Sequence, residues 1–123
     1  KVSTTLPKDL PIVLIADTRI NLLLAKQLFK DYKNVELFED PEAAIQYITE
    51  KKPSLVITDV HMPKLSGYEL LEKIKSNKDL QQIKVLANSA EQSLMTNKNT
   101  TYQFDGVLEK GFDLQTLSSI YYN

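Results

Sequence analysis

Cysteine is absent from this chain of 123 residues, so a disulfide framework and a thiolate metal site are both excluded. No apolar run is long enough to span a bilayer, and no signal peptide is visible. The formal net charge is −1, which gives no overall field that would attract nucleic acid or a membrane. These absences favour a cytoplasmic protein without direct nucleic-acid or membrane partners.

The composition that remains is typical of a globular protein, with 42% hydrophobic and 25% charged residues. A chain of 123 residues suits one domain with its own core. We expect residues 1–10 to form an irregular leader and residues 11–123 to form a single domain. The chain starts at Lys1 rather than at a methionine, which leaves open a piece of a longer protein or a processed chain.

Apolar runs alternate with segments of helical periodicity along the chain. Short apolar runs indicate strands, and apolar residues at intervals of three and four indicate helices. The expected strands cover residues 11–17, 35–40, 53–59, 83–90 and 106–111. The expected helices cover residues 20–32, 40–52, 67–76 and 113–122. Residues 91–105 are rich in Thr and Asn, and we expect only a short or mobile helix there.

Several local signals mark the helices. In the first helix, helical spacing places five residues on one side, namely Ile20, Leu23, Leu24, Gln27 and Leu28.

The second and third helices have recognisable starts. Asp40 followed by Pro41 is typical of a capped helix start. Ser66 followed by Glu69 predicts a capping box for the third helix.

Polar side chains stand at the ends of four expected strands. Asp17 ends the first, Asp59 the third, Ser89 the fourth and Lys110 the fifth. Strands that alternate with helices predict an α/β fold, with a parallel sheet covered by helices on both faces. Sites in such sheets form at the carboxyl ends of the strands. We therefore expect these four residues to share one pocket.

These residues and their neighbours resemble the receiver domain of two-component response regulators. The resemblance rests on Asp17, on "DVHMPKLSG" from Asp59 to Gly67, on "NSA" at 88–90 and on "EKGF" at 109–112. It extends over roughly residues 11–122. It implies a doubly wound, flavodoxin-like (βα)5 fold, with a five-stranded parallel sheet in the order 2-1-3-4-5.

The resemblance also implies a role for each site residue. Asp59 matches the phosphoacceptor, and Asp17 matches an acidic metal ligand. The metal site would be completed by Asp59 and by the backbone carbonyl of His61. Ser89 and Lys110 match the residues that contact the phosphoryl group, and the transfer chemistry falls to Asp59 and Lys110.

The implied cofactor is Mg²⁺, and the implied phosphodonor is a phosphohistidine on a histidine kinase or a histidine phosphotransfer protein. An output domain in a longer chain is a further implied partner. The residue types suit this chemistry, because a carboxylate can become an acyl phosphate and a lysine can supply a point charge. The resemblance implies a signalling module and not an enzyme, apart from self-phosphorylation at Asp59 and slow loss of that phosphate.

Three positions depart from the family pattern. Ala16 stands where the family usually has a first acid, which implies weaker Mg²⁺ binding. Gly111 replaces the usual proline after the lysine, which loosens that loop. Val107 replaces an aromatic residue that moves on activation in the family. These departures favour an alternative, a degenerate receiver that works as a protein-interaction module without phosphate.

Two unrelated doubly wound proteins are weaker alternatives. A flavin-binding, flavodoxin-like domain would need a phosphate loop rich in Ser, Thr or Gly after the first strand, and "DTRINLLLA" has no glycine. An aspartate-nucleophile phosphatase would need a second acid two residues after Asp59, where His61 stands. A lone histidine does not make a zinc site either.

Overall fold

A parallel sheet of five strands forms the centre of the computed structural model, which describes residues 6–89 and 102–122. The strand order is β2-β1-β3-β4-β5, and all neighbouring strands run parallel. This confirms the doubly wound α/β fold that the sequence predicts. The strands are β1 (Ile12–Ile15), β2 (Val35–Phe38), β3 (Leu55–Asp59), β4 (Lys84–Ser89) and β5 (Gly106–Glu109).

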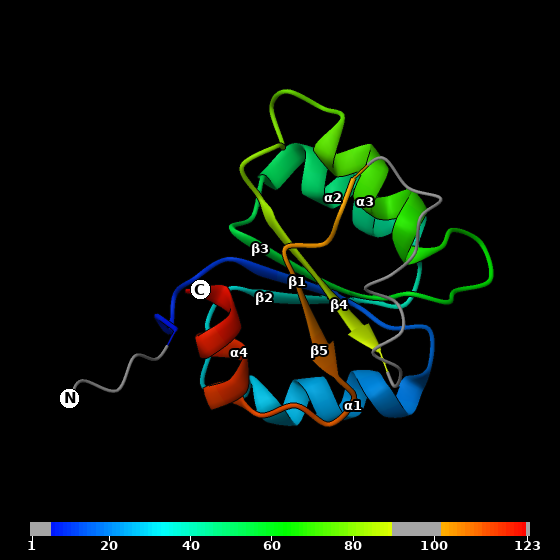
Figure 1. The fold of residues 1–123 in the computed structure, drawn as a ribbon. Helices are drawn as coiled ribbons and strands as arrows, with labels where there is room; N and C mark the ends of the chain where they lie inside the picture. The colour runs from blue at the N-terminus through cyan, green and yellow to red at the C-terminus, as the bar shows by residue number, and fades with distance from the viewer. Residues whose placement is uncertain (1–5, 90–101, 123) are drawn as a thin grey trace.

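Helices cover both faces of this sheet. Figure 1 shows α2 and α3 on one face, and α1 and α4 on the other. The helices are α1 (Arg19–Leu28), α2 (Pro41–Lys51), α3 (Gly67–Lys75) and α4 (Leu114–Tyr121). Most of the segment 91–105, where a short helix is expected, lies outside the described residues.

The helix starts follow from side chains that accept backbone hydrogen bonds. The Asp40 carboxylate accepts from the Glu42 N–H at 3.1 Å and caps α2. At α3 the Ser66 hydroxyl accepts from the Glu69 N–H at 3.1 Å, while the Glu69 carboxylate accepts from the Ser66 N–H at 2.9 Å. The predicted cap at Asp40 and the predicted capping box at Ser66 are therefore confirmed.

Two apolar clusters, one on each face, hold the helices to the sheet. Alternate strand residues such as Leu14 and Ile57 face α1 and α4, whereas Val13 and Val56 face α2 and α3. Every residue of β3 is buried, as expected for a central strand with helices on both sides. The sheet is therefore held in place by helices on both faces, and its carboxyl edge presents the residues at the strand ends at fixed positions.

Helix α1 leaves at its surface three of the five residues that helical spacing places on one side, whereas Leu28 packs against the apolar cluster. Ile20, Leu23 and Leu24 are 69%, 57% and 62% exposed. The helix instead buries Ala25 against the sheet, with Leu22 and its neighbours beside it. The sequence of α1 carries two overlapping apolar stripes, and the stripe with the small alanine at its centre lies against the strands. Ile20, Leu23 and Leu24 of the other stripe are left at the surface.

Part of the segment before β1 is packed into the fold. Leu6 is 1% exposed and belongs to the cluster between the sheet and α1 and α4. The Tyr32 hydroxyl donates to the Leu6 carbonyl at 3.2 Å. The Lys33 N–H donates to the Lys8 carbonyl at 2.9 Å. These bonds attach residues 6–10 to the connection between α1 and β2.

Leu6→Ala is expected to lower the free energy of unfolding by about 2–5 kcal/mol, because it leaves a cavity in a buried cluster. Urea denaturation of the purified chain measures this loss. Leu23→Ala is the matched control, since Leu23 is 57% exposed and its truncation should change stability by about 0.5 kcal/mol or less. Equal stabilities of the two variants would contradict the packing of Leu6.

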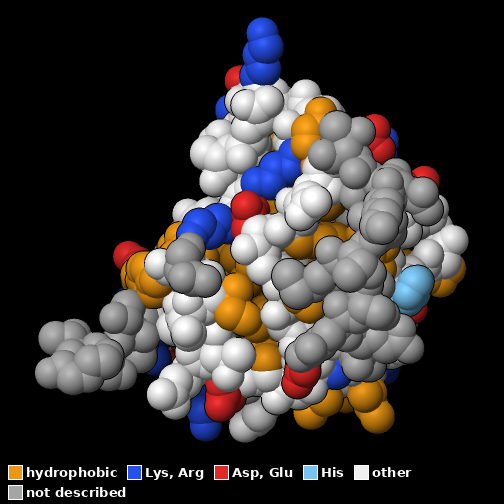
Figure 2. All heavy atoms as spheres, in the orientation of Figure 1, with side chains coloured by type: hydrophobic (Ala, Val, Ile, Leu, Met, Phe, Trp, Pro, Cys, Tyr) orange, Lys and Arg blue, Asp and Glu red, His pale blue; other side chains and the backbone are white. Residues whose placement is uncertain are grey.

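The surface shows no specialised charge pattern on the side drawn in Figure 2. Basic and acidic side chains are interspersed there, without a continuous area of one sign. None of the helices in residues 6–89 and 102–122 has the length and apolarity required to cross a bilayer.

Candidate functional site

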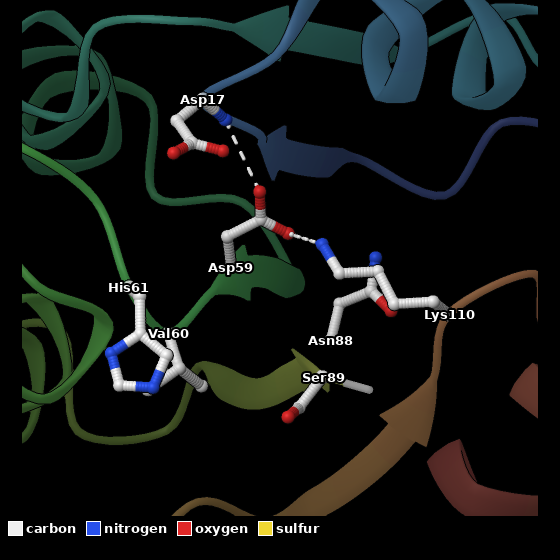
Figure 3. A pocket seen from close by; sticks show the side chains of 7 residues that line it. All are labelled: Asp17, Asp59, Val60, His61, Asn88, Ser89 and Lys110. Atoms are coloured by element: carbon white, nitrogen blue, oxygen red, sulfur yellow. Dashed lines mark hydrogen bonds and ion pairs between the residues drawn. The ribbon is translucent and has the colours of Figure 1, made fainter. Parts of the chain in front are cut away.

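The four residues that the sequence places at strand ends lie together in one pocket. Asp59 and Ser89 are the last residues of β3 and β4, and Lys110 follows β5 directly. Asp17 lies two residues beyond β1. Figure 3 shows these side chains around a cavity of about 220 Å³, which is lined by Asp17, Asp59, Val60, His61, Asn88, Ser89 and Lys110.

The Asp59 carboxylate lies at the centre of this pocket and is nearly buried. The residue is 3% exposed. Lys110 Nζ donates to Asp59 Oδ1 at 2.7 Å, and the Asp17 N–H donates to Asp59 Oδ2 at 3.1 Å. Each carboxylate oxygen is thus held by a donor from a different strand end (Figure 3).

Burial raises the pKa of the Asp59 carboxyl above its ordinary value. The hydrogen bond and the positive charge of Lys110 lower this pKa, but by less than burial raises it. The ionised carboxylate is therefore less stable here than in water, and it gains from any additional cation or donor in the pocket. A buried, perturbed carboxyl in a polar cavity is a common property of reactive groups.

The backbone behind Asp59 is fixed by the start of α3. The Gly67 N–H donates to the Val60 carbonyl at 2.7 Å. A Cβ at position 67 would lie 2.5 Å from the Asp59 carbonyl oxygen, so only glycine allows this approach. The Thr58 hydroxyl donates to the same Asp59 carbonyl at 2.8 Å. Gly67, the last residue of the "DVHMPKLSG" segment, thus fixes the backbone from which the Asp59 carboxylate extends.

Lys110 reaches Asp59 because the chain turns directly after β5. The Lys110 N–H donates to the Ser89 carbonyl at 3.1 Å, which continues the pairing of β4 with β5. Gly111 then adopts a φ of 83°, a left-handed conformation that favours glycine. The Lys110 side chain is 36% exposed, so its ammonium lies between the buried carboxylate and solvent.

The oxygen donors of the pocket suit a small, hard cation. Asp17 and Asp59 contribute two carboxylates to the lining, and His61 lies beside them. In the part of the chain that is described, no cluster of three or more His, Cys, Asp or Glu side chains could hold a metal ion. Mg²⁺ is usually bound through one or two carboxylates and keeps several waters. These two carboxylates therefore fit Mg²⁺ better than a zinc-type site.

Sequence reasoning does not single out Asn88 and Val60, which also line the pocket. Asn88 pairs with Asp59 across β3 and β4, so the strand register brings it to the pocket. Its place directly before Ser89 is a signal that could have identified it.

Two of the positions that depart from the family pattern are wholly or partly shielded from solvent. Ala16 is buried, and Val107 is half-buried.

Solved structures with this fold include signalling proteins. CheY4, the chemotaxis response regulator of Vibrio cholerae, matches with a TM-score of 0.80 and 19% identity, over 91% of this chain and 98% of that one. The receiver domain of the sensor histidine kinase PA1611 from Pseudomonas aeruginosa, solved with a magnesium ion in its active-site cleft, matches with a TM-score of 0.78 and 20% identity. The match covers 92% of this chain and 94% of the PA1611 domain.

Curated relatives match by sequence. Histidine kinase P4 of Formosa agariphila is 32% identical over 102 residues, which is 83% of this chain and 7% of that protein. The two-component response regulator ORR7 of Oryza sativa subsp. japonica is 28% identical over 81% of this chain and 45% of its own length. This chain therefore spans less than half the length of either relative.

The family model described as the response regulator receiver domain matches residues 12–122. This range contains the whole sheet, all the described helices and every residue of the pocket. The sheet order and the position of the acid at the end of β3 agree with that match. The chain therefore belongs to the response regulator receiver domain family.

Proposed function

We propose that this chain accepts a phosphoryl group on Asp59 from a phosphohistidine of a histidine kinase or a histidine phosphotransfer protein, and passes on the signal by a conformational change. The observation that carries the proposal is the nearly buried Asp59 carboxylate, bound by the Lys110 ammonium at 2.7 Å. A structural ion pair would not need a polar cavity of about 220 Å³ beside it, whereas a phosphoacceptor does.

The transfer is a displacement at phosphorus. One Asp59 carboxylate oxygen forms a bond to phosphorus as the P–N bond of the donor breaks, and the electron pair of that bond stays with the imidazole nitrogen. Lys110 offsets the negative charge of the phosphoryl oxygens, and the Ser89 hydroxyl donates to one of them. Most of the catalysis in such a transfer is positioning and electrostatic stabilisation.

Asp17, Asp59 and the backbone carbonyl of His61 would hold Mg²⁺ beside the acceptor. When bound, the ion supplies positive charge that neutralises phosphoryl oxygens. The Asp17 carboxylate lies on the side of Asp59 away from Lys110 (Figure 3), so it would hold the positive charge of the ion on that side. Because Ala16 offers no further carboxylate beside those of Asp17 and Asp59, we propose that Mg²⁺ binds weakly.

A degenerate receiver, which binds partners without phosphate, is the second candidate. The exposed apolar side of α1, with Ile20, Leu23 and Leu24, is the observation that favours it. The composition of the pocket argues against this candidate, because Asp59, Lys110, Ser89 and Asp17 all line it. Uptake of phosphate separates the two candidates.

The test is incubation of the purified chain with Mg²⁺ and a small phosphodonor such as acetyl phosphate, followed by intact-mass measurement. A mass increase of one phosphoryl group that disappears when a chelator removes Mg²⁺ would support the proposal. An unchanged mass after prolonged incubation with both reagents would favour the degenerate receiver.

Ala16→Asp is expected to tighten Mg²⁺ binding by about 10–100-fold, because carboxylates that hold metal-bound water change affinity by that amount. Titration followed by NMR measures the affinity. Without metal the variant should be less stable than the parent, since it adds a like charge beside Asp59.

Asp17→Asn is the control for this titration, because it removes a proposed ligand and should weaken Mg²⁺ binding. If Ala16→Asp bound Mg²⁺ no more tightly than the parent, the assignment of Asp17 as the second acid of the site would be wrong.

A further inference from the structure

Three neighbouring side chains form a row across the carboxyl edge of the sheet. Ile15 pairs with Thr58, so Ala16 lies beside Asp59 one residue further along both chains. Asp59 in turn pairs with Asn88. Paired residues of neighbouring parallel strands have their side chains on the same face of the sheet. The paired residues two positions earlier, Leu14, Ile57 and Leu86, face α1 and α4. Asp59 therefore lies between an apolar neighbour, Ala16, and an amide neighbour, Asn88.

Asn88 and Lys110 together form the wall between two cavities. Both line the pocket that contains Asp59, and both line the second cavity of about 260 Å³ beneath α1. Figure 3 shows their side chains on the side of the pocket away from His61. The rest of the second cavity is mostly apolar, with Leu14, Ala16, Leu24, Ala25, Leu28 and Phe112 in its lining.

The side-chain amide oxygen of Asn88, Oδ1, is buried and accepts no hydrogen bond from any described residue. Buried polar atoms are nearly always hydrogen-bonded, so an unused acceptor beside a reactive group calls for an explanation. The Asn88 oxygen is therefore available to a hydrogen-bond donor that reaches it only when the occupancy of the pocket changes.

The Lys110 ammonium is such a donor. It carries three N–H groups, and in this state one of them goes to Asp59 Oδ1. After phosphoryl transfer one Asp59 oxygen is bonded to phosphorus and the carboxylate charge is lost. The ammonium then turns to the phosphoryl oxygens and needs a further acceptor to stay oriented. Ala16, on the other side of Asp59, has no polar atom to offer.

We infer that Asn88 is a positioning residue for Lys110, and this inference rests on the proposed function. Its carbonyl oxygen accepts a hydrogen bond from the ammonium when a phosphoryl group occupies Asp59. The amide orients the lysine without adding negative charge, so the full positive charge of Lys110 faces the phosphoryl group. Asn88 thus supplies on the β4 side a polar contact that Ala16 does not supply on the β1 side.

The test uses Asn88→Leu, which keeps a similar volume and removes the acceptor. Beryllofluoride is the probe, because it mimics a phosphoryl group on a carboxylate, and NMR titration measures its affinity in saturating Mg²⁺. We expect about 10–100-fold weaker beryllofluoride binding, the range for loss of one hydrogen bond to a charged group. Mg²⁺ affinity should stay unchanged, and thermal stability should not fall, because leucine removes a buried acceptor that has no partner among the described residues.

Asn21→Leu is the matched control, since Asn21 lines the second cavity but not the pocket of Asp59. It should leave both affinities unchanged. Exchange of the Lys110 ammonium protons, followed by ¹⁵N NMR, is a readout that a packing role would not change. It should be slow in the parent with beryllofluoride and fast in Asn88→Leu. Asn88→Ala serves the same comparison if the leucine variant does not fold.

Beryllofluoride binding equal to the parent's in the Asn88 variant would overturn the assignment while leaving the proposed function in place. A parallel loss of Mg²⁺ affinity would also overturn it, because Asn88 would then support the whole pocket. A parent that neither binds beryllofluoride nor takes up phosphate would overturn the proposed function, and the role of Asn88 with it.

Discussion

Asp59→Asn is expected to abolish phosphorylation of the chain and, at neutral pH, to stabilise its fold. The amide has nearly the shape of the carboxylate but cannot form an acyl phosphate, so the loss of labelling should be complete. The gain in stability follows from burial, which raises the pKa of the Asp59 carboxyl. A neutral side chain at this position avoids the cost of a buried charge.

The pH dependence of stability gives the sign of this effect. Between the ordinary Asp pKa of 3.8 and the raised value of the folded state, the folded chain binds the Asp59 proton more tightly than the unfolded chain does. The stability that this group contributes therefore falls as the pH rises through that window. Asp59→Asn lacks this contribution, so its advantage over the parent should be present at neutral pH and absent below the ordinary Asp pKa.

Urea denaturation of both proteins at about pH 7 and about pH 3 measures this difference. A variant that is less stable than the parent at neutral pH would show that the ion pair with Lys110 outweighs the burial of the carboxylate. Persistent phosphorylation of the variant would place the acceptor elsewhere in the chain.

Lys110→Ala should slow phosphorylation by about 10²–10³-fold, which is the usual cost of removing one preorganised group that stabilises developing charge. Lys110 is not a ligand in the proposed metal site, so Mg²⁺ binding should persist. Loss of the ammonium also removes the two effects of Lys110 that lower the pKa of Asp59, and that pKa should rise further. The conformational response of the loop after β5 to a phosphate mimic should disappear.

The rate with acetyl phosphate and Mg²⁺, followed by intact mass, measures the first effect, and NMR of the loop measures the second. Lys64→Ala is the control, since the Lys64 side chain is 63% exposed in a loose 3.9 Å pair with Asp40. It should behave like the parent. An unimpaired rate in Lys110→Ala would remove Lys110 from the transfer step.

The sequence predicts the sheet and the shared position of the four pocket residues well, because both depend on short-range patterns. Apolar runs mark the strands, and the caps at Asp40 and Ser66 mark helix starts within a few residues. The strand ends then bring Asp59, Ser89 and Lys110 to one edge, because parallel strands of one sheet share their direction. The parallel strand order thus brings residues that are far apart in the sequence into one pocket.

Features that depend on packing between distant segments are not visible in the sequence. The buried side of α1 depends on how closely Ala25 approaches the sheet, and periodicity alone does not show that Ile20, Leu23 and Leu24 stay exposed. Leu6 is buried because the Tyr32 hydroxyl and the chain near Asn34 hold the segment before β1 in place. Asn88 comes to the pocket through its pairing with Asp59, and the only local signal for this is its place directly before Ser89.

The most direct test of the central claim is to locate the phosphate. Borohydride reduces an aspartyl phosphate to homoserine, so treatment of the chain after incubation with phosphodonor and Mg²⁺ marks the acceptor for peptide mass spectrometry. We expect homoserine at position 59 and at no other aspartate. Homoserine at Asp17, or a stable phosphate on Ser89 with an unreduced Asp59, would contradict it.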